Sequence, residues 1–164
     1  MPSRDTADST DAALLKALTA DPRAATSALA ERVGLSRNTV QARLGRWTAD
    51  AVLSTFERTI TPTFLGYPLR AFVFTNVKQR LLTEVADALS EIPEVVEVHG
   101  LSGRTDLLIQ VVARDADDLY RVAGQILSIR GVKRTNTALV IRDLVSFRLT
   151  PLIDRIRGRL VTRR

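Results

Sequence analysis

The stretch that decides the fold runs from Thr26 to Trp47 and reads TSALAERVGLSRNTVQARLGRW. It divides into two short helical patterns. In the first pattern Leu29 and Val33 lie four residues apart and therefore share one helix face. Gly34 can adopt the left-handed backbone that ends a helix, and the hydroxyl of Ser36 can cap the next helix. The stretch thus predicts two helices joined by a tight turn.

The second of these helices has two different faces. Val40, Leu44 and Trp47 repeat at intervals of four and three residues, so they form a buried stripe. The opposite face carries polar or small residues: Arg37, Asn38, Gln41, Gly45 and Arg46. Two helices joined in this way are typical of a helix-turn-helix, whose second helix lies in the DNA major groove. An ordinary helical hairpin with a solvated polar face is the alternative.

The residue types on this helix suit DNA contact. Arg can bond guanine bidentately, and Asn or Gln can bond adenine in the same way. We therefore expect Arg37, Asn38 and Gln41 to contact bases. Hydroxyl and basic side chains hold phosphates. Ser36, Thr39, Arg43 and Arg46 are the candidates for that role.

Composition bounds the remaining possibilities. The chain has 164 residues, of which 45% are hydrophobic and 26% are charged, as in a soluble globular protein. It contains no cysteine and one histidine, so disulfides are excluded and we expect no metal site and no cofactor. No paired-carboxylate spacing or Gly-rich phosphate loop suggests an enzyme. Because no apolar run spans a membrane and no signal-peptide core opens the chain, we expect a cytoplasmic protein.

The net charge of +6 is unevenly distributed. Residues 61–147 carry ten basic and ten acidic side chains, whereas residues 148–164 carry six arginines and one aspartate. Between Arg32 and Trp47 every charge is positive. This local basic face is what contact with phosphates requires.

The first third of the chain reads as a small helical domain followed by a linker. Residues 1–9 are small, polar and charged, and we expect them to be flexible. A first helix over residues 10–20 completes a three-helix domain over residues 10–52. Residues 53–68 then form a hinge, either a strand or an extended linker, because Pro62, Gly66 and Pro68 break regular structure.

The second half alternates strands and helices. We expect strands over residues 69–77, 95–101, 106–113 and 132–147, and helices over residues 78–91 and from residue 115 onward. This βαββαβ order predicts an α+β, ferredoxin-like domain over residues 69–148, with one sheet backed by two helices. Residues 149–164 form a basic tail.

The tail has a helix signal at its start. Thr150 can act as the cap and Pro151 can occupy the first helical position. Three interpretations remain open: a helix that docks on a partner subunit, a second basic contact to DNA, or a frayed terminus.

The whole chain resembles the Lrp/AsnC family, the feast/famine regulators of bacteria and archaea. The resemblance covers roughly residues 10–148 and rests on the order and spacing of several short motifs. In the first domain these are Asp11, Leu14-Leu15, Leu18, Leu29-Ala30, Val33-Gly34-Leu35-Ser36, Val40 and Arg43-Leu44. In the second they are Gly103-x-x-Asp106, Gly131-Val132 and Thr135-x-Thr137.

The resemblance implies a DNA-binding transcriptional regulator whose second part, the RAM domain, forms dimers and often senses amino acids. The turn of Gly103, Arg104, Thr105 and Asp106 is the candidate effector pocket, because its glycine, carboxylate and guanidinium suit an amino acid, and by resemblance it meets Thr135 and Thr137 across a dimer contact. A hairpin turn in which Asp106 only bonds its own backbone is the alternative. The chain departs from the family at Ala51, where a glycine usually ends the third helix. It also lacks the aromatic residue that often flanks the turn aspartate.

The expected partners of the protein follow from the size of its recognition helix and from the family resemblance. A single recognition helix reads few base pairs, so we expect a homodimer on palindromic double-stranded DNA, joined through apolar strands that carry Phe72, Phe74, Leu108 and Val111. The resemblance adds assembly into tetramers or octamers. Two alternatives remain: an architectural DNA-binding protein without an effector, and a subunit like the haem-biosynthesis decarboxylases that share this architecture.

Overall fold

A computed structural model describes residues 6–158, in which the chain forms two compact units. Unit 1 consists of the chain up to Thr55 together with the part from Val145 onward, and unit 2 spans Phe56–Leu144. The chain therefore leaves unit 1, builds unit 2 and returns. The C-terminal segment, which the sequence suggested as a separate tail, belongs to the same unit as the first helices.

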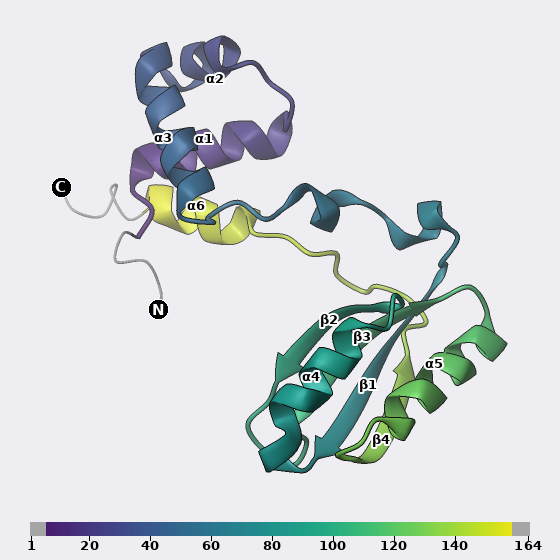
Figure 1. Ribbon diagram of the computed structural model, residues 1–164. Helices are drawn as coiled ribbons and strands as arrows, with labels where there is room; N and C mark the ends of the chain where they lie inside the picture. Colours follow the sequence, from purple (N-terminus) through teal and green to yellow (C-terminus); the bar gives the residue numbers. More distant parts are fainter. Residues whose placement is uncertain (1–5, 159–164) are drawn as a thin grey trace. The chain divides into compact units, whose positions relative to one another are not determined.

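Unit 1 contains four helices among the described residues. They are α1 (Ser9–Ala20), α2 (Thr26–Val33), α3 (Arg37–Ala49) and α6 (Thr150–Gly158) (Figure 1). The core of α1, α2 and α3 contains residues of the predicted apolar stripes. Leu14, Leu29, Val40 and Trp47 are all buried. The predicted three-helix arrangement is confirmed.

The first helix begins one residue earlier than its pattern predicted. Asp8 is its N-cap and accepts a hydrogen bond from the Asp11 N–H at 2.6 Å, while the Asp11 carboxylate accepts from the Asp8 N–H at 3.0 Å. This reciprocal pair is a capping box. The expectation of a flexible segment up to residue 9 is therefore wrong for residues 8 and 9, and residues 1–5 lie outside the described part.

The turn between α2 and α3 forms as the sequence predicts. Gly34 has φ +68°, and the following N–H of Leu35 donates to the carbonyl of Ala30 at 2.9 Å. The hydroxyl of Ser36 accepts a hydrogen bond from the Thr39 N–H at 3.1 Å and so caps α3. Local chemistry at two residues thus fixes where the second helix starts.

An alanine follows the end of α3 in a backbone conformation that glycine adopts at a lower free-energy cost. Ala51 has φ +52°, and Val52 N–H donates to the carbonyl of Trp47 at 2.9 Å. With the Ala51 N–H bonded to the carbonyl of Thr48 at 3.4 Å, this is a Schellman arrangement. Ala51 therefore takes the left-handed conformation despite its side chain.

The connection to unit 2 contains no strand. Two short 3₁₀ turns, Phe56–Thr59 and Pro62–Leu65, occupy the region predicted as a strand or extended linker. Pro62 lacks the N–H that a strand would donate, and Gly66 ends the second turn with φ +88°. The strand alternative is thus wrong, because the local hydrogen bonds close within the segment.

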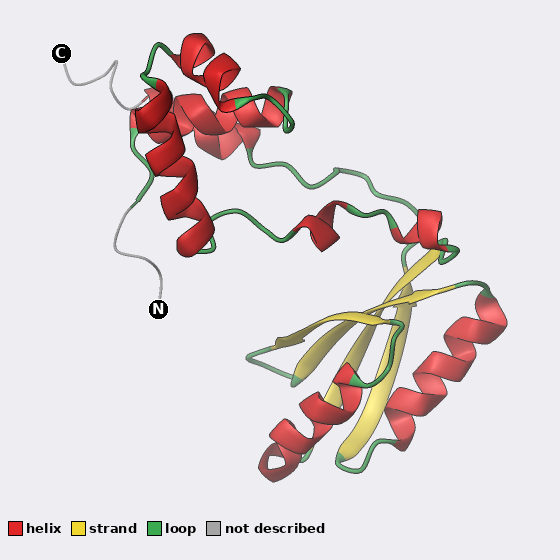
Figure 2. Cartoon of the chain, turned by 45° about the horizontal axis from the view of Figure 1, so that its top comes forward, coloured by secondary structure: helices red, strands yellow, loops and turns green. Residues whose placement is uncertain are grey.

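Unit 2 is a four-stranded antiparallel sheet with helices on one face. Its elements are β1 (Leu69–Val77), a 3₁₀ turn (Gln79–Leu81), α4 (Leu82–Ser90), β2 (Val95–Gly100), β3 (Leu107–Ala113), α5 (Ala116–Ser128) and β4 (Val132–Leu139). The strand order is β2-β3-β1-β4. Figure 2 shows α4 and α5 lying on the same side of the sheet. The predicted βαββαβ ferredoxin-like fold is confirmed.

The two faces of the sheet differ in what covers them. Ala71, Val73 and Val111 pack against the helices and are fully buried. Residues that alternate with them, Phe72 and Phe74, lie on the opposite face and are half-buried. The placement of Val111 with the exposed apolar strand residues was wrong, since its register with Ala71 turns it toward the helices.

The last strand is much shorter than predicted. β4 ends at Leu139, which pairs with Ala71, and the Val140 N–H donates to the carbonyl of Arg70 at 2.8 Å. β1 begins at Leu69, which lies opposite residue 141, so β1 offers no partner backbone for residues 142–147. This stretch contains apolar residues, but a strand also needs a neighbouring strand to pair with.

The tail helix begins at Thr150 itself, one residue earlier than predicted. The Ile153 N–H donates to the carbonyl of Leu149 at 3.1 Å, so Thr150 is the first helical residue and Pro151 the second. Proline is tolerated there because that N–H needs no intrahelical partner. The predicted residues 159–164 of the tail lie outside the described part.

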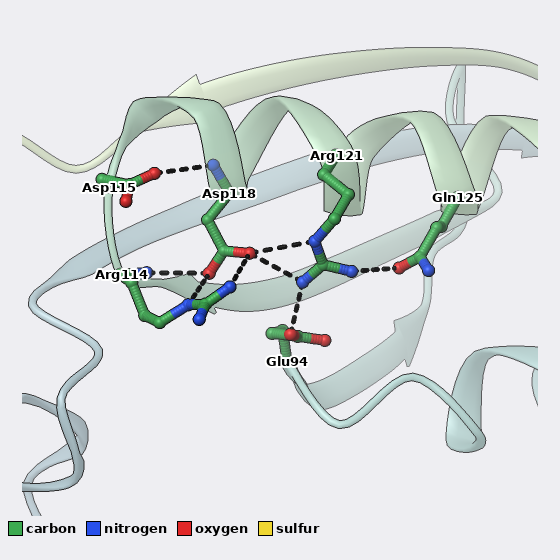
Figure 3. A network of polar contacts seen from close by, with 6 residues as sticks. All are labelled: Glu94, Arg114, Asp115, Asp118, Arg121 and Gln125. Carbon is green, nitrogen blue, oxygen red and sulfur yellow. Dashed lines mark hydrogen bonds and ion pairs between the residues drawn. The ribbon is translucent and has the colours of Figure 1, made fainter.

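A network of charged side chains fixes the start of α5 (Figure 3). The buried carboxylate of Asp118 accepts hydrogen bonds from the N–H and Nε of Arg114 and from Nε of Arg121, each at 3.0 Å. Asp115 caps the helix by accepting from the Asp118 N–H at 2.8 Å. Arg121 also pairs with Glu94, which precedes β2. The guanidinium of Arg114 is the main reason why the pKa of Asp118 lies well below its usual value.

Candidate functional site

The recognition helix α3 presents one fully exposed polar face. Ser36, Arg37, Asn38, Thr39, Gln41 and Arg46 are all exposed, whereas Val40 and Trp47 are buried in the core. A shallow open hollow on this side is lined by Asn38, Thr39, Ala42, Arg43 and Arg46. The structure thus brings six of the seven candidate DNA-contacting residues to the solvent side of one helix.

The N-terminal end of α3 is shaped to meet an anion. Ser36 and Thr39 share a hydrogen bond between their hydroxyl oxygens at 2.8 Å. The first N–H groups of a helix carry a partial positive charge and attract phosphate. Helix amides and two hydroxyls therefore lie together at this end of α3.

Arg43 differs from the other candidates because its charge is engaged within unit 1. Its guanidinium bonds both carboxylate oxygens of Asp8, with Nη2 at 3.1 Å from Oδ2, and also bonds Asp11. Asp11 is 4% exposed and lies at the start of α1. These contacts raise the pKa of Arg43, and the hydrogen bond to Asp11 is the largest cause. The pKa of Asp8 is lowered, mainly by the hydrogen bond from the Asp11 N–H and also by Arg43. We therefore revise the role of Arg43 from phosphate contact to an anchor between α1 and α3.

Sequence reasoning missed this anchor and the centre of the helix face. Asp8 and Asp11 have the spacing of a capping box, which could have located both the helix start and the carboxylates. Ala42 lies in the middle of the exposed face, where a small side chain lets α3 approach another surface closely. Its i+4 spacing from Asn38 places both on the same side.

The candidate effector turn connects β2 to β3. Gly103 has φ +130°, a conformation that only glycine adopts without strain. Arg104 is exposed, and its carbonyl accepts a hydrogen bond from the Asn76 amide at 2.8 Å. Thr105 and Asp106 are half-buried. The turn is thus tied to the end of β1.

The Asp106 carboxylate already has partners within the chain. Oδ2 accepts from the Val77 N–H at 2.9 Å, and Oδ1 accepts from the Gln79 amide at 3.0 Å. The bond from Val77 is the main reason why the pKa of Asp106 lies below its usual value. Asp106 is therefore a carboxylate at ordinary pH. Each oxygen keeps a second acceptor site.

Thr135 and Thr137 lie on the edge strand β4, with β1 between them and the turn. Thr135 pairs with Thr75, whose carbonyl accepts from the Asp106 N–H at 3.1 Å. Thr137 pairs with Val73, one step further along. Within one chain, Thr75 therefore neighbours both the turn and Thr135, whereas Thr137 has a different pairing partner. The Thr75 hydroxyl is fully buried and lacks a hydrogen-bond partner among the described residues.

Family models match both parts of this architecture. The AsnC-type helix-turn-helix domain matches residues 8–46, which include α1, α2 and most of α3. The Lrp/AsnC ligand binding domain matches residues 70–149. A proline dehydrogenase transcriptional activator from Rhizobium radiobacter is 32% identical over 144 residues, covering 85% of this chain and 92% of that protein. The chain belongs to the Lrp/AsnC family.

Solved structures of the family agree with the fold. Escherichia coli AsnC superposes with a TM-score of 0.79 at 23% identity, covering 90% of this chain and 100% of that one. A feast or famine regulatory protein from M. tuberculosis, complexed with L-methionine, gives a TM-score of 0.75 at 29% identity, covering 87% and 97%. This Lrp/AsnC chain is a DNA-binding transcriptional regulator with a ligand-binding domain.

Two other kinds of site are absent from residues 6–158. No helix there is long and apolar enough to cross a membrane. Nor do three or more histidine or acidic side chains gather there as metal ligands would. The exposed face of α3 and the effector turn remain the two candidate sites.

Proposed function

We propose that this regulator reads DNA with the exposed face of α3. Arg37, Asn38 and Gln41 contact base edges in the major groove, and Ser36, Thr39 and Arg46 hold phosphates beside it. The observation that supports this assignment is the exposure of all six side chains on a helix whose other face, Val40 and Trp47, is locked into the core. A rigid helix keeps its reading side chains in register.

Binding measurements with a selected site and a scrambled duplex test this assignment. Arg37→Ala and Gln41→Ala should each cost about 1–3 kcal/mol on the selected site and little on the scrambled duplex. Arg46→Ala, the matched phosphate variant, should weaken both duplexes alike. Unchanged binding of the selected site by both base-reading variants would show that the face is misassigned.

We further propose that the turn Gly103–Asp106 binds an amino acid. The Asp106 carboxylate is ionised and keeps acceptor sites for an ammonium group, Gly103 opens backbone amides to a carboxylate, and Arg104 can pair with a second one. Thr135 and Thr137 complete the pocket from a partner subunit. L-methionine is the first probe, because it is bound in the M. tuberculosis relative.

Calorimetric titration of amino acids, beginning with L-methionine, tests the pocket. Asp106→Asn keeps the size of the side chain and one of its two acceptor oxygens and removes the charge that pairs with ammonium, so binding should weaken at least tenfold. Asp143→Asn removes an exposed carboxylate elsewhere in unit 2 and serves as the control. Equal affinity in wild type and Asp106→Asn removes Asp106 from the site.

Assembly and location follow from the same role. We propose a homodimer, which assembles further into tetramers or octamers, and a cytoplasmic location where the protein meets DNA. An effector can shift DNA affinity only if it binds two assembly states differently. We propose no catalytic role, in line with relatives that are transcriptional regulators.

A further inference from the structure

The net positive charge of the protein lies entirely in unit 1. Unit 2, residues 56–144, carries eleven basic and eleven acidic side chains and is neutral. Unit 1 carries thirteen basic and seven acidic side chains, which accounts for the whole net charge of +6. Most of that excess comes from residues 148–164, with six arginines and one aspartate. The tail therefore supplies the field around the DNA-binding unit.

The tail helix is attached to the DNA-binding helices. Helix α6 packs against α1, and Lys16 Nζ pairs with Asp154 Oδ1 at 2.7 Å. Ala12 lies one turn before Lys16 on the same face of α1, is fully buried, and is not part of the core shared by α1, α2 and α3. Ile153 and Ile156 of α6 are half-buried. Helix α6 is thus connected to α1 by packing and by one ion pair.

By sequence, the tail carries far more arginine than acidic charge. Asp154 is the one acidic residue between positions 148 and 164, and Lys16 neutralises it. Arg148 and Arg155 are exposed. Arginine is strongly suited to phosphate oxygens because its planar guanidinium binds them bidentately. Residues 150–164 lie outside both family matches.

We infer that α6 and the arginines around it form a second DNA contact that binds backbone phosphates without reading sequence. This inference rests on the proposed DNA binding by α3 and adds to it a separate electrostatic arm. Each phosphate contact releases counterions, so the arm should steepen the salt dependence of binding to any duplex. It should raise affinity for selected and random sequences by the same factor.

A matched pair of charge variants tests the arm in the full-length protein. The tail variant combines Arg148→Gln and Arg155→Gln, which removes two exposed arginines and keeps the Lys16–Asp154 pair and the isoleucines of α6. The control combines Arg80→Gln and Arg130→Gln, which removes the same charge from exposed positions of unit 2. Dissociation constants for a selected site and a random duplex are measured between 50 and 400 mM salt, with thermal midpoints as a check of folding.

The tail variant should lower the slope of log affinity against log salt by about two per protomer and weaken both duplexes about tenfold at low salt. The control should change the slope far less. A tail variant with wild-type slope overturns the inference, as does one that changes only the oligomeric mass or binding to RNA. Failure of the wild type to bind duplex DNA at any salt would instead refute the proposed function.

Discussion

At the scale of single residues, Ala51 shows a local conflict that the fold overrides. Its left-handed backbone, φ +52°, completes the hydrogen bonds that end α3, although an alanine pays about 1 kcal/mol for that conformation. Ala51→Gly should therefore raise the free energy of unfolding of unit 1 by about that amount. Ala42→Gly, an exposed mid-helix control, should lower it by about 1 kcal/mol. A denaturant titration in which Ala51→Gly is destabilising contradicts this account.

A second residue-scale prediction concerns acid stability. The pKa of Asp118 is lower in the folded protein than its ordinary value of 3.8, so folding favours the carboxylate. Its contribution to stability is complete above that ordinary value and declines as the pH falls below it. Thermal midpoints of wild type should drop between pH 5 and pH 2, and Asp118→Asn should flatten this drop while lowering the midpoint at pH 7. An identical pH profile in the variant would separate Asp118 from acid unfolding.

At the scale of elements, the anchor between α1 and α3 distinguishes Arg43, which bonds two aspartates, from Arg46, which we propose contacts DNA. Arg43→Met leaves the buried Asp11 without its guanidinium, which should cost about 1–3 kcal/mol of folding stability. Arg46 is exposed, with Nη2 3.7 Å from Asp11, so Arg46→Met should cost well under 1 kcal/mol of stability and instead weaken DNA binding. Urea titrations of both variants measure the difference, and equal losses would contradict the division of roles.

Sequence periodicity predicted most helices and strands, because the burial of one face imposes a regular spacing of apolar residues. The spacing of Val40, Leu44 and Trp47 predicted α3 and its exposed face, and the order of apolar runs predicted the βαββαβ sheet. Partner choice was not predictable in the same way. The sequence did not show that Asp8 and Asp11, at the start of α1, bind Arg43. The apolar residues within 141–147 extended the predicted last strand, although β1 offers no backbone before Leu69 for it to pair with.

At the scale of the whole molecule, the open face of the sheet in unit 2 is the expected dimer interface. Phe72 and Phe74 lie half-buried on the face opposite the one that packs against α4 and α5. Phe74→Asp places a charge on this apolar face and should convert a dimer or larger assembly into a monomer. Light scattering after gel filtration measures the mass, with Phe147→Asp, outside the sheet, as the control. A variant Phe74→Asp of unchanged mass would locate the interface elsewhere.

Selection of binding sites from a random duplex library tests the central claim that α3 of a two-fold assembly reads DNA. We expect an inverted repeat whose half-site centres lie one helical turn, roughly 10 base pairs, or a multiple of it apart. We also expect Gln41→Arg to change one preferred base from adenine to guanine in each half-site. Enrichment of no repeat, or an identical repeat for wild type and Gln41→Arg, would contradict this claim.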